Sequence, residues 1–187
     1  MNAAAILADE EGSGGELSLA RLAERLGVRK PSLYNHVGGV GDLKRELALL
    51  GLRDLEWSLS RAVAGKADEE GLFALAEAYR RFVKQRPGLY AATVRSYRLY
   101  APGDPELGAA EAEALEPVLA VLDSCGVGSD EAIHAARGLR SIAHGFATLE
   151  EGGGFGMDVD VDESFRKLVR SFIDGLDRAS SPGFPEA

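Results

Sequence analysis

Residues 18–44 hold two short helical patterns joined by a glycine-containing turn, and this segment constrains the chain more than any other. In the first pattern, apolar side chains recur at the i, i+3, i+4, i+7 spacing of one helix face: Leu19, Leu22, Ala23 and Leu26. Ser18 precedes them as an N-cap, and Gly27 follows where a helix end favours a left-handed backbone. The pattern therefore predicts a short amphipathic helix that ends at Leu26.

The second pattern begins at Pro31, a residue suited to the first turn of a helix, and runs to Val37. Only Leu33 and Val37 are expected to point inward. The other side chains are polar groups of the kind that donate to phosphates and base edges from a helix in the major groove. This pattern indicates the recognition helix of a DNA-reading helix-turn-helix. The alternative is a helical hairpin with no nucleic-acid role.

The segment GVRKPSLYNHV, with the preceding LARLAERL, resembles the DNA-binding domain of the TetR family of bacterial repressors. The Gly-Val turn, the Ser-Leu-Tyr triplet and the following His carry the resemblance. Val40 departs from it, because the family usually has a Lys near this position. We expect base contacts from Lys30, Pro31, Ser32 and Asn35, phosphate contacts from Ser18, Tyr34, His36 and Lys44, and Arg29 beside them on the DNA-binding surface.

The net charge of −9 is unevenly distributed along the chain. Residues 1–17 carry four acids and no base, residues 18–50 carry six bases and three acids, and residues 51–187 carry fifteen bases and twenty-three acids. The basic residues are thus in excess only in the segment that holds the two helical patterns. Because a phosphate surface responds to the local charge, the acidic total does not argue against DNA binding.

The rest of the sequence predicts an all-α protein, since strand-like alternation is confined to the short acidic run 157–162. We expect an N-terminal helix-turn-helix domain of three helices over residues 1–46, a helical-bundle domain for ligand binding and dimerisation over 47–179, and a disordered tail over 180–187. Helices are predicted over 2–10, 19–26, 31–37, 43–63, 70–85, 105–124, 129–151 and 162–176, with Asp42, Asp104 and Asp162 at helix starts and a short helix and loop over 88–100.

Patterns typical of catalytic and metal sites are incomplete in this chain. The glycine run at 152–156 has no following Lys-Ser or Lys-Thr, and the alternating acids at 158–162 lack the Gly and Glu of a calcium loop. Ser141 and His144 lack a nucleophile elbow. The single Cys125 excludes an intrachain disulfide, and no apolar run suggests a membrane span. We expect no catalytic residue, metal or cofactor, and a cytoplasmic protein.

The pair His144-Gly145 resembles part of the signature of a TetR subgroup named for Trp-His-Gly, although Ala143 replaces the Trp. This resemblance implies that the last two long helices pair with their copies in a homodimer. The helices also carry more apolar width than one intrachain contact needs, although an ordinary buried core would explain that width equally. The expected interface residues are Leu139, Phe146, Phe165, Leu168, Phe172 and Ile173.

Aromatic side chains from several segments suggest a cavity for a small apolar or aromatic effector: Trp57, Tyr79, Phe82, Tyr90, Tyr97 and Tyr100, with His144. Filling of the helical core is the alternative role for the aromatic rings. The sequence thus predicts a homodimeric, ligand-responsive repressor that binds a palindromic operator in double-stranded DNA. A DNA-binding regulator without an effector, and a helical enzyme or scaffold with an incidental helix-turn-helix, remain open alternatives.

Overall fold

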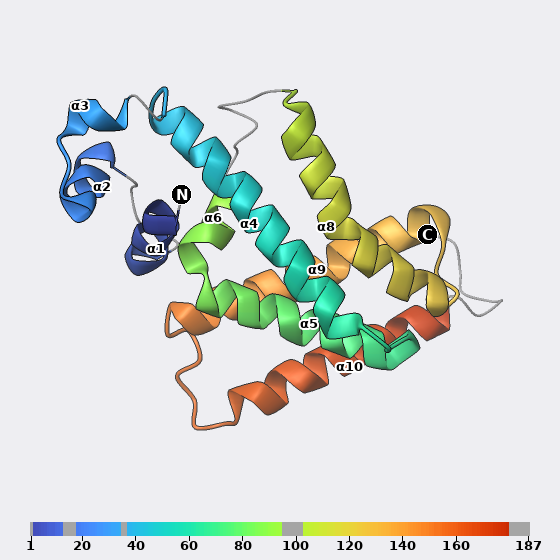
Figure 1. The fold of residues 1–187 in the computed structure, drawn as a ribbon. Helices are drawn as coiled ribbons and strands as arrows, with labels where there is room; N and C mark the ends of the chain where they lie inside the picture. Colours follow the sequence, from blue (N-terminus) through green and yellow to red (C-terminus); the bar gives the residue numbers. More distant parts are fainter. Residues whose placement is uncertain (1, 13–17, 35–36, 95–102, 180–187) are drawn as a thin grey trace. The chain divides into compact units, whose positions relative to one another are not determined.

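The computed structural model describes residues 2–12, 18–34, 37–94 and 103–179, and α-helix is the regular structure throughout these residues. The all-α prediction is therefore confirmed (Figure 1). The helices are α1 (Asn2–Glu11), α2 (Leu19–Leu26), α3 (Lys30–Leu33), α4 (Val40–Val63), α5 (Asp68–Gln85), α6 (Pro87–Val94), α8 (Pro105–Ser124), α9 (Ser129–Glu151) and α10 (Val161–Ala179).

The chain packs as two compact units. The N-terminal unit comprises Met1–Leu55 and Gln85–Glu113, and the C-terminal unit comprises Glu56–Lys84 and Ala114–Ala187. The N-terminal unit thus extends past the expected boundary at residue 46 and includes α6, while the division of function between 1–46 and 47–179 stays a prediction. The tail 180–187 lies outside the described residues. Within the described residues, no helix is both long and apolar enough to cross a membrane.

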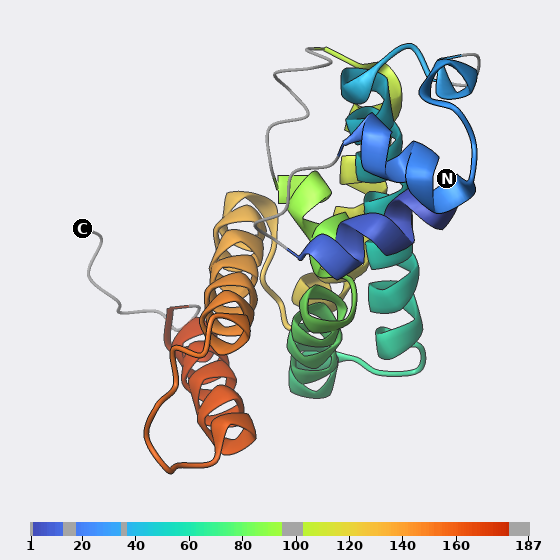
Figure 2. The same cartoon turned by 90° about the vertical axis from the view of Figure 1, so that its left-hand side faces the viewer.

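The core of the N-terminal unit is built from short aliphatic side chains of α1, α2, α3, α4 and α6. Leu43 and Leu47 of α4 and Leu89 of α6 are almost fully buried in this cluster. Helix α1 packs against both α2 and α6, and Figure 2 shows α1 lying alongside α6. The helix-turn-helix therefore shares its core with α6, which lies more than fifty residues further along the chain.

In the C-terminal unit, α9 and α10 pack against each other. Phe165, Val169 and Ile173 recur every four residues along α10, and all three are buried. At Gly138 of α9, an added Cβ would lie 2.7 Å from the ring of Phe172, so the glycine permits close approach of the two helices. This glycine thus allows a close helix contact within a single chain.

The starts of α4 and α10 differ from the predictions by one to three residues. Helix α4 begins at Val40, so Asp42 lies in its first turn, where its carboxylate still faces the positive end of the helix dipole. Helix α10 begins at Val161, and Oδ1 of Asp160, rather than Asp162, accepts the Glu163 N–H at 2.6 Å. At the end of α2, Leu26 is 46% exposed, so the expected apolar face stops one turn earlier.

Candidate functional site

The first helix of the helix-turn-helix begins and ends where the sequence predicts. Oγ of Ser18 accepts a hydrogen bond from the Ala20 N–H at 3.2 Å and so caps α2. Gly27 has φ +64°, a conformation that glycine adopts with little cost. The Val28 N–H then donates to the Ala23 carbonyl at 3.0 Å, which satisfies a carbonyl of the last turn. Because these contacts are local, residue pattern alone was sufficient to predict them.

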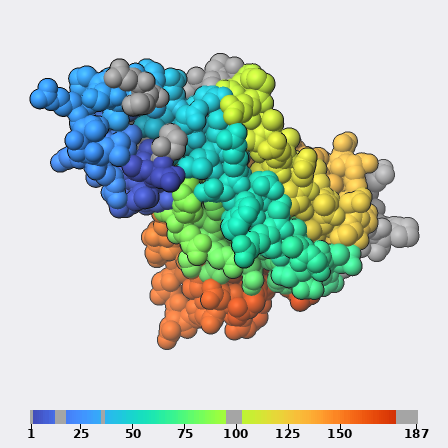
Figure 3. Space-filling model, in the orientation of Figure 1, coloured from blue at the N-terminus to red at the C-terminus, as the bar shows by residue number. Residues whose placement is uncertain are grey.

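The described part of the reading helix is the single turn α3, shorter than the predicted helix from Pro31 to Val37. Leu33 is buried beneath it as predicted, and the Val37 N–H donates to the Leu33 carbonyl at 3.0 Å. Tyr34 is 52% exposed at the end of the turn. This segment lies at the surface in Figure 3. Arg29, Lys30, Pro31 and Ser32 are also exposed, whereas Asn35 and His36 lie outside the described residues.

The two expected phosphate-binding residues that flank α3 are less exposed. Ser18 and Lys44 are both partly buried, at the start of α2 and in the second turn of α4. The Ser18 hydroxyl oxygen accepts the cap bond, which leaves its proton free to be donated elsewhere. The turn α3 thus exposes its polar side chains, while Leu33 anchors it in the core. The DNA-binding role of the individual residues stays a prediction.

Helix α2 also carries ion pairs that the sequence reasoning did not predict. Glu10 of α1 holds Arg25 of α2 with both carboxylate oxygens, one of them 2.9 Å from Nη2. Nη1 of Arg21 lies 2.6 Å from Oε1 of Glu11, although this buried oxygen accepts no hydrogen bond from the described residues. Acids at the C-terminal end of a helix oppose its dipole. Their presence at the end of α1 was the available signal that they have tertiary partners.

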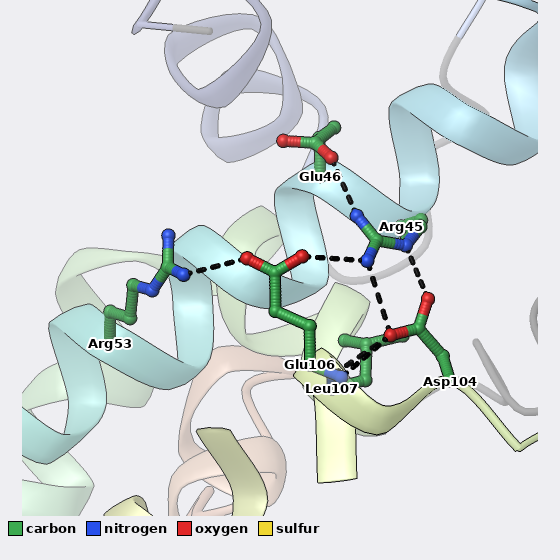
Figure 4. A network of polar contacts seen from close by, with 6 residues as sticks. All are labelled: Arg45, Glu46, Arg53, Asp104, Glu106 and Leu107. Atoms are coloured by element: carbon green, nitrogen blue, oxygen red, sulfur yellow. Dashed lines mark hydrogen bonds and ion pairs between the residues drawn. The ribbon is translucent and has the colours of Figure 1, made fainter. Parts of the chain in front are cut away.

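A second network joins α4 to the start of α8 within the N-terminal unit (Figure 4). Arg45 donates to Asp104 through Nε at 2.5 Å and to Glu106 through Nη2 at 2.8 Å, and Arg53 also donates to Glu106. Asp104 caps α8 as predicted, since its Oδ1 accepts the Glu106 and Leu107 N–H groups. The Arg45 hydrogen bond, with the help of these backbone donors, lowers the pKa of Asp104 to about 2. The network fixes the first turn of α8 on α4.

The expected effector-binding residues fall in both units. In the C-terminal unit, Tyr79 and Phe82 of α5 are buried, Trp57 is exposed beneath the guanidinium of Arg61, and His144 is partly buried. Tyr90 is buried in the N-terminal unit. Tyr97 and Tyr100 lie outside the described residues. The burial of the rings agrees with core packing as well as with the wall of a cavity, so their ligand-binding role stays a prediction.

The C-terminal unit contains a charged cluster around Arg80 that the sequence reasoning missed. This α5 side chain donates to both oxygens of Glu150 at 2.9 Å and lies 2.8 Å from Asp162. Its guanidinium also stacks over the rings of Phe146 and Phe165, at 5.2 and 4.8 Å from the centroids. Arg80 therefore joins the end of α9 to the start of α10.

The pKa values in this cluster follow from its contacts. Burial opposes the charge of Arg80, but hydrogen bonds to Glu150 and Asp162 outweigh burial and raise the pKa of Arg80. Burial likewise favours the neutral form of Glu150, yet the bonds from Arg80 and Lys84 lower its pKa below the ordinary value. The Arg80 hydrogen bond also lowers the pKa of Asp162. All three groups are thus held in their charged forms.

Most of the expected dimer residues are buried within one chain: Leu139, Phe146, Phe165 and Ile173. Such side chains have almost no surface left for a partner. Leu168 is 41% exposed and Phe172 is partly exposed, so these two retain surface on α10. The position of the dimer interface stays a prediction, with Leu168 as its most accessible member.

Comparison with known proteins places this architecture in a family. A family model described as "Tetracyclin repressor-like, C-terminal domain" matches residues 72–172. The HTH-type transcriptional regulator Rv0681 of Mycobacterium tuberculosis is 37% identical over 94% of this chain and 78% of that protein. The HTH-type transcriptional regulator YobS of Bacillus subtilis is 36% identical over 94% of this chain and 90% of that protein.

The fold is also similar to a solved structure of a TetR variant from Acinetobacter baumannii in complex with minocycline, with a TM-score of 0.67 and 22% identity over 96% of this chain and 95% of that chain. These matches carry no assignment to the Trp-His-Gly subgroup, which stays a prediction. The family in question is one of regulators rather than of enzymes. From the helix-turn-helix geometry and these matches, the chain belongs to the TetR family of DNA-binding transcriptional regulators.

Proposed function

We propose that this regulator is a ligand-responsive repressor that binds an inverted-repeat operator as a homodimer. The observation that carries the proposal is the capped α2, its left-handed turn at Gly27 and the exposed polar turn α3. Helices α2 and α3 together form what we call the reading head. One reading head covers only a few base pairs, so useful specificity needs two reading heads about one helical turn apart on the duplex.

Within this proposal, Lys30, Pro31, Ser32 and Asn35 face the bases, and Ser18, Tyr34, His36 and Lys44 hold phosphates. The test uses a duplex selected from a random library with the wild-type protein. Tyr34→Ala is expected to weaken binding to all duplexes together, whereas Asn35→Ala alters base preference by about 1–3 kcal/mol at one position. Glu131→Ala, an exposed change in the first turn of α9, is the control. Wild-type affinity in both head variants contradicts the assignment.

The homodimer is proposed to use the outer face of α9 and α10. Leu168 supports this proposal, because a large apolar side chain 41% exposed on a long helix has surface for a partner. Leu168→Asp is expected to shift the protein from dimer to monomer in light scattering. Arg166→Asp, two residues earlier and on a different side of the same helix, is the matched control. A wild-type protein that is monomeric at micromolar concentration contradicts this part of the proposal.

The effector is proposed to be a small apolar or aromatic molecule. The minocycline complex of the Acinetobacter baumannii protein supports the idea that this fold accommodates such a ligand. To act as a switch, the effector has to bind the DNA-incompetent arrangement more tightly than the competent one. A thermal-shift screen of aromatic drugs and apolar metabolites, followed by DNA-affinity measurements with each hit, tests this requirement. A compound that stabilises the protein but leaves DNA affinity unchanged argues against the switch.

A further inference from the structure

Helix α6 contacts two other helices of the N-terminal unit through glycines. An added Cβ on Gly88 of α6 would lie 2.0 Å from the carbonyl carbon and oxygen of Ala8 in α1. An added Cβ on Gly51 of α4 would lie 2.9 Å from the Leu89 carbonyl oxygen of α6. At Gly88, α6 therefore lies directly against the backbone of α1. At Gly51, α4 lies against both the backbone of α6 and the Thr93 side chain, whose Cγ2 would be 2.7 Å from the added Cβ. Because close-packed contacts are hardly compressible, a displacement of one helix at such a contact also displaces the other.

Asp9 holds the contact between α1 and α6. Its Oδ1 accepts the N–H groups of Gly88 and Leu89 at 3.1 and 3.0 Å, so a carboxylate from another helix caps the N-terminus of α6. Its Oδ2 accepts from Nε of Arg86 at 2.7 Å. Arg86 in turn donates from Nη1 to Asp54 of α4 at 2.8 Å. One aspartate thus ties α6 to the last turn of α1, and Arg86 connects the same site to α4.

The next two residues of α1 continue these contacts into the helix-turn-helix. Glu10 holds Arg25, and Glu11 pairs with Arg21, both on α2. Three consecutive acids at the end of α1 therefore face α6 on one side and α2 on the other. Arg86 is the single residue between the end of α5 and the start of α6.

We propose that Asp9 is a positioning residue for operator recognition, through which α6 sets the orientation of α2 and α3. The inference rests on the proposed DNA-binding function and assigns Asp9 to holding α2 and α3 in place rather than to contacting DNA. A head that is poorly positioned can still meet phosphates, but it fits the bases of its operator less well. Loss of the Asp9 contact therefore lowers specific affinity more than non-specific affinity.

The test measures the affinity of full-length variants for the selected duplex and for a scrambled duplex, with helical content followed by circular dichroism. Asp9→Ala is expected to bind the selected duplex about tenfold more weakly and the scrambled duplex unchanged. Asp9→Asn is expected to lie between Asp9→Ala and the wild type, because its amide oxygen can still accept the α6 N–H groups. Gly88→Ala separates α6 from α1 without changing a charge and is expected to reproduce the effect. Asp123→Asn, at an exposed position, is the matched control.

An unchanged ratio of specific to non-specific affinity in Asp9→Ala and Gly88→Ala overturns the inference while leaving DNA binding intact. An equal loss on both duplexes, together with lost helical content, also overturns it, because it indicates a merely structural role. A wild-type protein that shows no salt-sensitive binding to any duplex overturns the proposed function and the inference together. The duplex titrations and circular dichroism together distinguish the three results.

Discussion

Replacement of Arg80 tests how much stability the C-terminal unit loses when the buried Glu150 carboxylate is left without its arginine partner. Arg80→Met removes two hydrogen bonds to Glu150, an ion pair to Asp162 and two stacking contacts with phenylalanine rings. The Arg80 and Glu150 side chains are only 11% and 19% exposed, so the remaining carboxylate is poorly hydrated. Breaking a buried pair by removal of one partner costs about 3–5 kcal/mol. Because Lys84 remains within 2.5 Å of Glu150, we expect a loss near the lower end, about 3 kcal/mol.

Arg170→Met is a matched control in the same unit. Arg170 also pairs with a glutamate, Glu69, and also stacks over a phenylalanine ring, that of Phe73. Its side chain is 55% exposed, however, and exposed ion pairs contribute at most about 1 kcal/mol. The two variants therefore make the same chemical change and differ in burial.

The assay is urea unfolding followed by circular dichroism and by the fluorescence of Trp57, the single tryptophan of the chain. The double variant Arg80→Met with Glu150→Met removes the unpaired carboxylate and is expected to recover most of the loss, to within about 1 kcal/mol of the wild type. The reasoning is refuted if Arg80→Met costs no more than Arg170→Met. It is also refuted if the double variant is less stable than Arg80→Met alone.

Two further predictions concern the N-terminal unit. The pKa of Asp104 is about 2 in the folded state, below its ordinary value of 3.8, so its contribution to stability is present above pH 4 and is lost as the pH falls toward 2. Asp104→Asn should therefore make helix content less dependent on pH in an acid titration over that range. Gly27→Ala places a side chain at φ +64° and is expected to lower the unfolding free energy by about 1–2 kcal/mol. The control Gly108→Ala, within α8 where an added Cβ meets open space, should not destabilise the protein. Equal losses of the two variants in thermal or urea unfolding would argue against strain at the turn.

Local chemistry explains which features could be predicted from the sequence. The Ser18 cap, the Gly27 turn and the start of α8 at Asp104 each depend on residues within a few positions of one another. Their conformational preferences therefore operate without the rest of the fold. The family resemblance of the reading segment likewise depends on adjacent residues, and the comparisons confirm it.

The remaining contacts join residues that are distant in the sequence. Asp9 meets Arg86 across 77 positions, and Arg80 meets Glu150 across 70. Each arginine has many carboxylates as potential partners, and residue pattern does not select among them. The dimer residues stay a prediction for a related reason, because the apolar pattern of α10 does not distinguish a face buried in its own chain, such as that of Phe165, from one that covers a partner.

The ion pairs around the reading head also affect how DNA binding responds to ionic strength. At least three of the six bases in residues 18–50, Arg21, Arg25 and Arg45, lie against carboxylates of the same unit. In a plot of the logarithm of DNA affinity against the logarithm of salt concentration, each phosphate that the protein neutralises contributes about −0.9 to the slope. A guanidinium that is already paired with a carboxylate displaces few of the counterions condensed on DNA and therefore adds little to this slope. Operator occupancy should therefore vary less with cellular salt than the number of bases in the segment implies.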